Sequence, residues 1–257
     1  MRVPGEVSRL LARLHAPWTR FVFILAPMRS GTTLLNHVLA EAPGLLTAGE
    51  THLTYGSHAD LRHLVQKVYR YTRYAGLRPR TIVEKCVTDE LVTDPEALVH
   101  PRVKIIFMLR DAVGAVGSLL SLAGKNWPHA DDPADATAYF VARCTQLRTV
   151  ATRLGDPRRA FFLPYETLTD APHAALDALG HFLEVSEPLQ PDYGEQRWTG
   201  VPARGDLSET IRSGAIAARP KREAPTLTDE LRARIVAAHA ETTDHLQGTC
   251  TTVPPTE

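Results

Sequence analysis

Short runs of apolar residues alternate along this chain with longer segments in which apolar residues recur every three or four positions. The runs cover residues 20–25, 45–48, 81–86, 104–110 and 160–166, and their length is typical of buried strands. The longer segments predict amphipathic helices, among them 58–77, a helix that ends near Leu154, and 228–247. Strands that alternate with helices favour an α/β fold with one mostly parallel central sheet covered by helices.

The length and composition fit a single globular domain. With 257 residues, 44% of them hydrophobic and 23% charged, the chain is within the range of one α/β domain. Its 29 basic and 29 acidic residues balance, which argues against nucleic acid as a partner. The three cysteines have no metal-binding spacing, and no segment resembles a signal peptide or a membrane span. We therefore expect a cytoplasmic protein without stable membrane insertion; the sequence does not specify an oligomeric state.

Three segments outside this alternating core carry weaker patterns. Residues 1–19 contain a short amphipathic helix, which we expect to pack on the domain, although its arginines leave a membrane-surface position as an alternative. Residues 199–225 are rich in glycine and proline and predict a long loop over the edge of the sheet. Residues 251–257 are expected to form a frayed tail.

The link between the first strand and the following helix has the features of an anion-binding site. It runs from Pro27 to Thr33 with the sequence Pro-Met-Arg-Ser-Gly-Thr-Thr. A turn of small residues that opens a helix leaves backbone N–H groups unpaired, with the positive end of the helix dipole behind them. Gly31 lets the backbone approach closely, Thr32 and Thr33 add hydroxyl donors, and Arg29 adds a cationic fork. The sequence thus predicts a cradle for a phosphate or sulfate group.

This cradle differs from a Walker A loop. That motif requires a lysine directly before the hydroxyl residue, whereas Gly31 is followed here by Thr32. A small-molecule kinase that uses ATP and Mg²⁺ is therefore an alternative and not the first interpretation. A nucleotide-binding module without catalytic activity is a second alternative.

Two charged residues near the ends of neighbouring strands are candidate site residues. Glu50 follows the strand 45–48, and Lys85 lies near the end of the strand 81–86. In open parallel sheets, ligands bind outside the carboxyl ends of the strands. A cap or a surface ion pair is the structural alternative for Glu50, and an ion pair with Asp89 or Glu90 is the alternative for Lys85.

A second pair of candidates comes from the strand 104–110 and the helix after it. Arg110 closes the strand, and Asp111 is a good N-cap for the helix. Ser118 lies about 10 Å along that helix at ~1.5 Å per residue, so that Arg110 and Ser118 can approach one group.

Two polar clusters have simpler interpretations. His129 and the aspartates of residues 128–135 suggest a metal site, but Asp132 before Pro133 is a typical helix start, so we expect no metal. The basic residues of segment 58–77 predict a solvated helix face.

Four separated segments, in the right order, resemble the family of sulfotransferases that use 3′-phosphoadenosine-5′-phosphosulfate (PAPS), in particular its bacterial members. They are the loop 27–35, the strand and helix around 106–118, the stretch 163–183, and the late segment 205–214. The resemblance implies a P-loop-like sulfotransferase fold and PAPS as sulfonate donor, with adenosine 3′,5′-bisphosphate as product and no metal. The implied nucleotide-binding residues are Arg29, Ser30, Gly31, Thr32, Thr33, Arg110, Ser118, Arg212, Ser213 and Gly214. The stretch around Tyr165 is assigned a structural role only.

The resemblance also implies a catalytic arrangement. Gly49-Glu50-Thr51 is similar to the acidic catalytic position of protein-tyrosine sulfotransferases, and Glu84-Lys85-Cys86 is similar to the stretch whose lysine faces the sulfonate. We expect Glu50 to be the general base, with His52 as the fallback, while Lys85 and Arg29 stabilise the transition state. The acceptor is a hydroxyl group of a small molecule, a glycan or a lipid-linked sugar.

Overall fold

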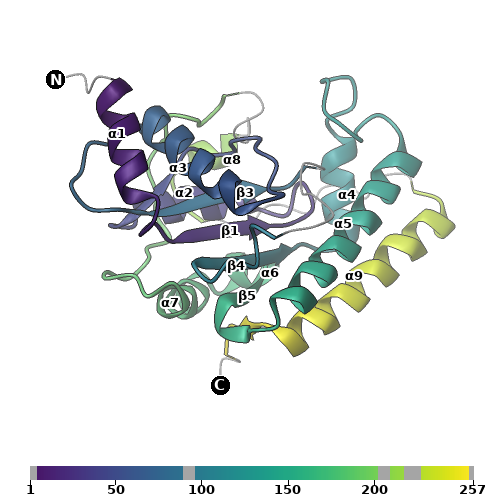
Figure 1. Ribbon diagram of the computed structural model, residues 1–257. Coiled ribbons are helices and arrows are strands. Elements are labelled where there is room, and N and C mark those ends of the chain that lie inside the picture. The colour runs from purple at the N-terminus through teal and green to yellow at the C-terminus, as the bar shows by residue number, and fades with distance from the viewer. Residues whose placement is uncertain (1–4, 89–95, 202–208, 217–226, 255–257) are drawn as a thin grey trace.

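The computed structural model describes residues 5–88, 96–201, 209–216 and 227–254. Within these residues an all-parallel sheet of six strands, in the order β2-β3-β1-β4-β5-β6, forms the centre of the molecule (Figure 1). The strands are β1 (Phe21–Leu25), β2 (Leu45–Thr47), β3 (Thr81–Cys86), β4 (Val103–Leu109), β5 (Ala160–Pro164) and β6 (Thr251–Thr252). This confirms the predicted α/β fold of one domain with a parallel sheet.

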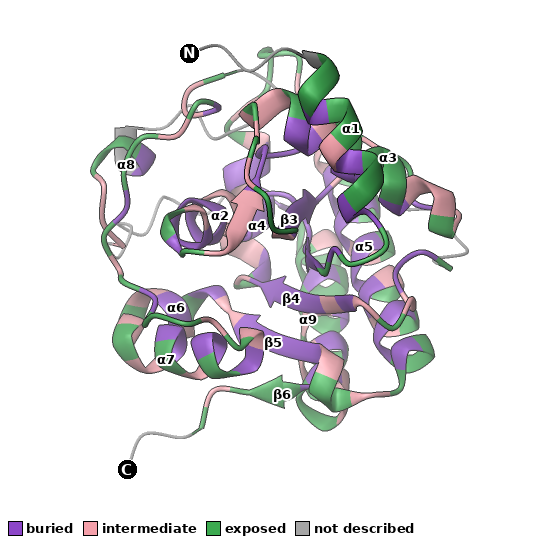
Figure 2. Ribbon diagram, turned by 60° about the vertical axis from the view of Figure 1, so that its left-hand side comes forward, coloured by how far each residue is buried: buried purple, intermediate pink, exposed green. Residues whose placement is uncertain are grey.

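Helices cover both faces of the sheet. They are α1 (Gly5–His15), α2 (Thr32–Glu41), α3 (His58–Thr72), α4 (Ala112–Leu120), α5 (Pro133–Leu154), α6 (Tyr165–Asp170), α7 (Pro172–Leu183), α8 (Glu209–Arg212) and α9 (Asp229–Thr249), with a 3-10 turn at Pro157–Arg159. Figure 2 shows α1, α3, α5 and α9 on one side of the sheet and α2 and α7 on the other. The central strands β1 and β4 are buried because both of their faces are covered.

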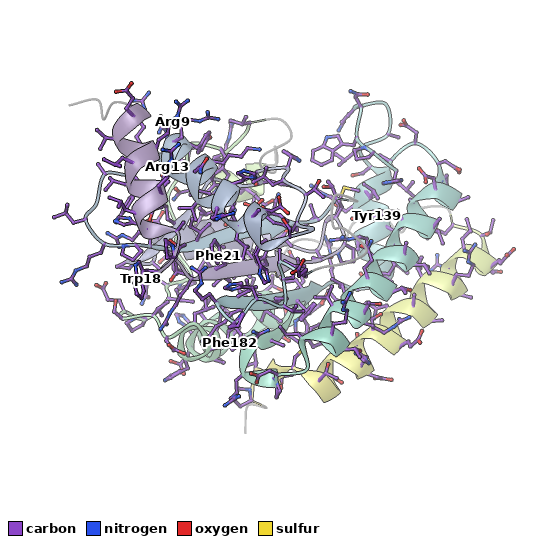
Figure 3. The ribbon with its side chains drawn as sticks, in the orientation of Figure 1. Arg9, Arg13, Trp18, Phe21, Tyr139 and Phe182 are labelled. Atoms are coloured by element: carbon purple, nitrogen blue, oxygen red, sulfur yellow. The ribbon has the colours of Figure 1, made fainter. Side chains whose placement is uncertain are left out.

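The predicted N-terminal helix forms and packs on the domain. Helix α1 packs on α3, with Ser8, Ala12 and His15 buried, and His15 Nδ1 lies 3.1 Å from the Tyr69 hydroxyl. Figure 3 shows Arg9 and Arg13 on this helix at the outside of the molecule, and Trp18, just after it, is 74% exposed. No helix among the described residues is both long and apolar enough to cross a membrane.

Two boundaries differ from the sequence prediction. β5 ends at Pro164, and Tyr165 opens the short helix α6, because Pro164 provides an extended N-cap. The expected tail at residues 251–257 begins with a strand, which corrects that prediction: Thr251 and Thr252 pair with β5, and Thr251 Oγ1 donates to the Pro157 carbonyl at 2.8 Å. Of the predicted loop 199–225, residues 202–208 and 217–226 lie outside the described part of the chain.

Candidate functional site

The loop between β1 and α2 has the backbone geometry that the cradle requires. Arg29 and Gly31 both adopt left-handed conformations, with φ of 68° and 84°. A Cβ atom on Gly31 would lie 2.3 Å from the ring of Tyr165, so this position excludes larger residues by both strain and space. Gly31 is also the N-cap of α2 and supplies no side chain, which leaves the first N–H groups of the helix without an intrahelical partner.

The cradle contains one polar atom whose hydrogen bonding is incomplete. The Ser30 side chain is fully buried, and its Oγ has no hydrogen-bond partner among the described residues. Buried hydroxyl groups are normally paired, so an unpaired one in a loop of this shape favours a ligand that supplies the missing partner.

Helix α5 anchors the cradle from behind. The Met28 N–H donates to the Tyr139 hydroxyl at 2.8 Å, and that hydroxyl in turn donates to the Val87 carbonyl. One turn further along α5, the fully buried Arg143 donates to the carbonyl oxygens of Ala26 at 3.1 Å and Cys86 at 2.9 Å. The ends of β1 and β3 are thereby held together, a function for Tyr139 and Arg143 that the sequence analysis did not assign.

Lys85, at the carboxyl end of β3, connects the predicted base to the cradle. Its Nζ forms an ion pair with Glu50 Oε2 at 2.9 Å and donates to Thr33 Oγ1 at 3.4 Å. Glu50 and Lys85 are 6% and 5% exposed, so the alternative of a surface ion pair for Glu50 is wrong. Glu50 Oε1 is buried and has no hydrogen-bond partner among the described residues, which leaves one carboxylate oxygen for a ligand. Asp89 and Glu90, the alternative partners of Lys85, lie outside the described residues.

A buried carboxyl group positions the segment that carries Glu50. Glu84 accepts hydrogen bonds from the N–H and the hydroxyl of Thr51 at 2.9 and 2.7 Å, and Asn36 Nδ2 lies 3.4 Å from the Gly49 carbonyl. Burial raises the pKa of Glu84 to about 8, against the lowering effect of the Thr51 hydrogen bonds. Burial likewise raises the pKa of Tyr55, whose hydroxyl lies 3.2 Å from Thr51 Oγ1. Glu84 is therefore largely uncharged at neutral pH, unlike a carboxylate in water.

The predicted pair Arg110 and Ser118 is found on the opposite side of the cradle. Arg29 Nε donates to Ser118 Oγ at 3.1 Å, and Arg110 Nη1 lies 3.5 Å from the Arg29 carbonyl. Asp111 caps α4 as predicted, accepting from the N–H groups of Val113 at 3.2 Å and Gly114 at 2.8 Å. Two arginines and a hydroxyl thus meet at one edge of the loop.

The stretch that was assigned only a structural role supports this arginine edge. The guanidinium of Arg110 lies over the Tyr165 ring at 4.9 Å, and Glu166 Oε1 accepts from the Asp111 N–H at 3.0 Å. A tyrosine and an acid directly after a strand are the only signal in the sequence that marks this contact.

Arg212, Ser213 and Gly214 lie beside the segment 192–200. The Tyr193 N–H donates to the Gly214 carbonyl at 2.7 Å, and Asp192 and Ala215 form an antiparallel bridge. That segment reaches α2 through the buried His37, whose ring nitrogens lie 2.8 Å from Thr33 O and 2.8 Å from Thr199 Oγ1. Residues 212–214 are thus linked to the cradle through intervening groups.

The remaining candidates are also placed by the structure. Of the two possible bases, Glu50 makes the ion pair with Lys85, whereas His52 is exposed with a left-handed φ of 53°. Asp132 caps α5 as predicted, and its carboxylate accepts from the Ala134 N–H at 3.1 Å. In the described part of the chain, no group of three or more His, Cys, Asp or Glu residues could hold a metal ion.

Comparisons with known proteins agree at the level of fold. No family model matches the chain, and a search of curated proteins finds no match. Among solved structures, the chain is similar to mouse sulfotransferase SULT7A1 complexed with PAP, with 12% identity, 96% of this chain and 93% of that chain covered, and a TM-score of 0.52. It is also similar to the sulfotransferase domain of the Synechococcus PCC 7002 olefin synthase, with 19% identity, 88% and 94% coverage, and a TM-score of 0.54. This chain therefore has the fold of these sulfotransferases, as the sequence motifs predicted.

Proposed function

We propose that this protein is an enzyme that transfers a sulfonate group from PAPS to a hydroxyl group of an acceptor. The single observation that carries the proposal is the buried ion pair between Glu50 and Lys85 at 2.9 Å, with Lys85 also in contact with Thr33 at the start of α2. This arrangement sets a carboxylate and a cation beside a loop suited to anions. The shared fold and the bound PAP in the SULT7A1 structure support the choice of donor.

The residues of the cradle fit the donor. PAPS supplies an activated sulfonate group and leaves as adenosine 3′,5′-bisphosphate. The uncapped N-terminus of α2, the Ser30 hydroxyl and Thr33 suit its 5′-phosphosulfate. Arg110 and Ser118 suit its 3′-phosphate, and Arg29 joins the two regions through its contact with Ser118 at 3.1 Å. We assign Thr32 and residues 212–214 to the surroundings of the nucleotide.

Glu50 and Lys85 have distinct tasks in this proposal. The free oxygen of Glu50 accepts the proton of the acceptor hydroxyl, while Lys85 orients the carboxylate through the other oxygen. Lys85 and Arg29 also offset the negative charge that develops between the sulfonate and the departing phosphate. Because these groups are held in place before the reaction, positioning and electrostatics supply most of the acceleration.

Binding of the desulfated product tests the donor assignment. Calorimetric titration is expected to show tight, EDTA-insensitive binding of adenosine 3′,5′-bisphosphate, and weak binding of ATP with Mg²⁺. Arg110→Ala is expected to weaken binding of the bisphosphate by roughly tenfold or more, since a charge-assisted contact is lost. Arg158→Ala, which removes an exposed arginine paired with Asp156 at 3.1 Å, is the matched control and should bind normally. Preferential binding of ATP with Mg²⁺ would favour the kinase alternative instead.

Transfer of labelled sulfonate to a panel of hydroxylated acceptors tests catalysis. Glu50→Gln and Lys85→Met are expected to lower kcat by about 10²-fold or more while the bisphosphate still binds, since general-base and electrostatic contributions are of this size. His52→Gln should retain activity. Wild-type turnover in Glu50→Gln, together with loss of activity in His52→Gln, would show that His52 is the general base. Bisphosphate binding with no transfer to any acceptor would favour a nucleotide-binding module.

A further inference from the structure

A cationic pocket opens beside the segment that carries Glu50. Its volume is about 390 Å³, and it is lined by Ala48, Lys67, Arg70, Tyr71, Arg73 and Arg197. Four of these six residues are cationic and none is acidic. A chain with no net charge has no general reason to place four cations around one hollow.

Three of the cations come from the C-terminal end of α3 and the residue that caps it. Lys67 and Arg70 lie three residues apart near the end of the helix, and Arg73 is its C-cap, with a left-handed φ of 56°. Like charges at this spacing destabilise a helix slightly. Arg62, Arg70 and Arg73 are exposed, as the sequence predicts for this helix, and Arg70 and Arg73 line the pocket together with the half-buried Lys67, whereas Arg62 does not.

The fourth cation, Arg197, is held in place by contacts with Tyr71 of α3. Arg197 Nη1 donates to the Tyr71 carbonyl at 3.1 Å, and its guanidinium lies 5.9 Å from the Tyr71 ring. Among the described residues, no carboxylate forms an ion pair with Arg70, Arg73 or Arg197. The pocket therefore presents guanidinium groups that no acidic side chain of the described chain neutralises.

The pocket lies next to the proposed catalytic segment, because one of its lining residues is close to Glu50 in the sequence. Ala48 lies two residues before Glu50, which limits their Cα separation to about 7 Å. At the same end, Lys67 Nζ donates to the carbonyl oxygen of Thr51, the residue after Glu50. From Lys67 the cationic lining continues to Arg70, about 4.5 Å along α3 at ~1.5 Å per residue, and then to the C-cap residue Arg73. A ligand in the pocket would thus extend away from Glu50 toward the arginines.

We propose that this pocket binds an anionic group of the acceptor, so that the acceptor carries a phosphate, sulfate or carboxylate some distance from the hydroxyl that is modified. Guanidinium groups pair with all three oxyanions, which defines the shared chemistry. This inference rests on the proposed function, because it assigns the pocket to the acceptor of that reaction. It also predicts that an uncharged acceptor is a poor substrate.

Anion binding to the protein saturated with adenosine 3′,5′-bisphosphate tests the pocket directly. Saturation fills the phosphate positions of the cradle, and sulfate, pyrophosphate and tricarballylate are then titrated at constant ionic strength. The pocket variants distinguish anion binding in the pocket from binding at the empty sulfonate position. We expect binding of at least one probe, weakened roughly tenfold in Arg70→Gln and in Arg197→Gln. Arg62→Gln, on the same helix outside the pocket, should bind as wild type. The relative affinities of the three probes identify the preferred oxyanion.

Two outcomes of this titration would overturn the pocket assignment. One is the absence of binding by all three probes, and the other is binding that neither pocket variant weakens. Melting temperatures of the three variants, measured alongside, identify any loss that comes from unfolding.

Matched acceptors separate this inference from the proposed function. Hydroxylated acceptors that carry the oxyanion preferred in the titration, as the free acid and as the methyl ester, are compared with labelled PAPS, and the acid is expected to have at least a tenfold higher kcat/KM. Arg70→Gln should remove that preference by lowering kcat/KM for the acid, while kcat/KM for the ester stays unchanged. Equal use of acid and ester by the wild type would overturn the inference and leave sulfonate transfer intact. Failure of the protein to bind the bisphosphate would overturn the proposed function itself.

Discussion

At the scale of single residues, both backbone strain and steric contact restrict position 31 to glycine. Gly31→Ala places a Cβ 2.3 Å from the Tyr165 ring at a φ of 84°. Gly44→Ala is a matched control, because Gly44 has a φ of 94° and nothing within 4 Å of its Cβ position. We expect Gly44→Ala to cost about 1 kcal/mol of unfolding free energy and Gly31→Ala about 1–3 kcal/mol more. Only Gly31→Ala should weaken bisphosphate binding.

Denaturant unfolding and calorimetry measure these two effects. Equal losses of stability in both variants would show that the Tyr165 ring yields freely. Normal bisphosphate affinity in Gly31→Ala would contradict the assignment of this loop as the cradle.

A second residue-scale prediction concerns Glu84 and the pH dependence of folding stability. Its pKa rises from 4.5 to about 8 on folding because of burial, so the folded protein holds this proton more tightly than the unfolded chain. The corresponding stabilisation is complete below about pH 4.5 and is lost as the pH rises toward 8. Glu84→Gln keeps an oxygen for Thr51 and cannot ionise. We therefore expect its stability relative to wild type to rise between pH 5 and 8, by up to a few kcal/mol.

Urea unfolding of both proteins across this pH range measures the difference. Glu187→Gln, which alters an exposed carboxylate, controls for the removal of one ionisable group. Parallel curves for Glu84→Gln and wild type would show that Glu84 is not held in its neutral form.

At the scale of elements, α5 clamps the ends of two neighbouring strands. Arg143→Met keeps the volume of the buried stem but leaves the carbonyl oxygens of Ala26 and Cys86 without their donor. We expect a loss of about 2–4 kcal/mol, because each unsatisfied buried carbonyl costs about 1–3 kcal/mol. Arg148→Met on the same helix removes contacts with the buried Thr242 at 2.9 Å and the exposed Glu241 at 3.2 Å. Because Thr242 Oγ1 still donates to the Ala238 carbonyl at 2.7 Å, this change should cost only about 1 kcal/mol. Thermal unfolding compares the two, and similar losses would contradict the clamp.

The elements also show what the sequence could predict. Five strands were identified from their apolar runs, which are largely buried in β1, β3, β4 and β5 and half-buried in the edge strand β2. Asp111 and Asp132 marked helix starts through their local chemistry. β6 escaped detection because two threonines at an edge carry no hydrophobic signal, and their pairing with β5 depends on tertiary contact. The roles of Tyr139 and Arg143 could not be predicted from the sequence for the same reason. Their helical spacing indicates only that they share a face, and their hydrogen bonds reach residues 52 to 117 positions away.

At the scale of the whole molecule, we expect binding at the cradle to be coupled to a distant part of the chain. His37 contacts both Thr33 in the first turn of α2 and Thr199 in the segment 192–200, and its ring lies 5.4 Å from that of Tyr193. We therefore expect a ligand that orders the start of α2 to stabilise also the segment that packs against residues 212–216. At a bisphosphate concentration 100 times its Kd, the folded state should gain about 2.7 kcal/mol.

Amide hydrogen exchange with and without the bisphosphate tests this coupling. In the wild type we expect protection to increase in the first turn of α2 and in residues 193–200. His37→Leu retains the bulk of the ring but breaks both hydrogen bonds, so protection of α2 should remain while protection of residues 193–200 is largely lost. His181→Leu, which alters an exposed histidine bonded to its own helix at 2.9 Å, should behave as wild type. If both segments remain protected in His37→Leu, the nucleotide contacts residues 193–200 directly, and the coupling does not depend on His37.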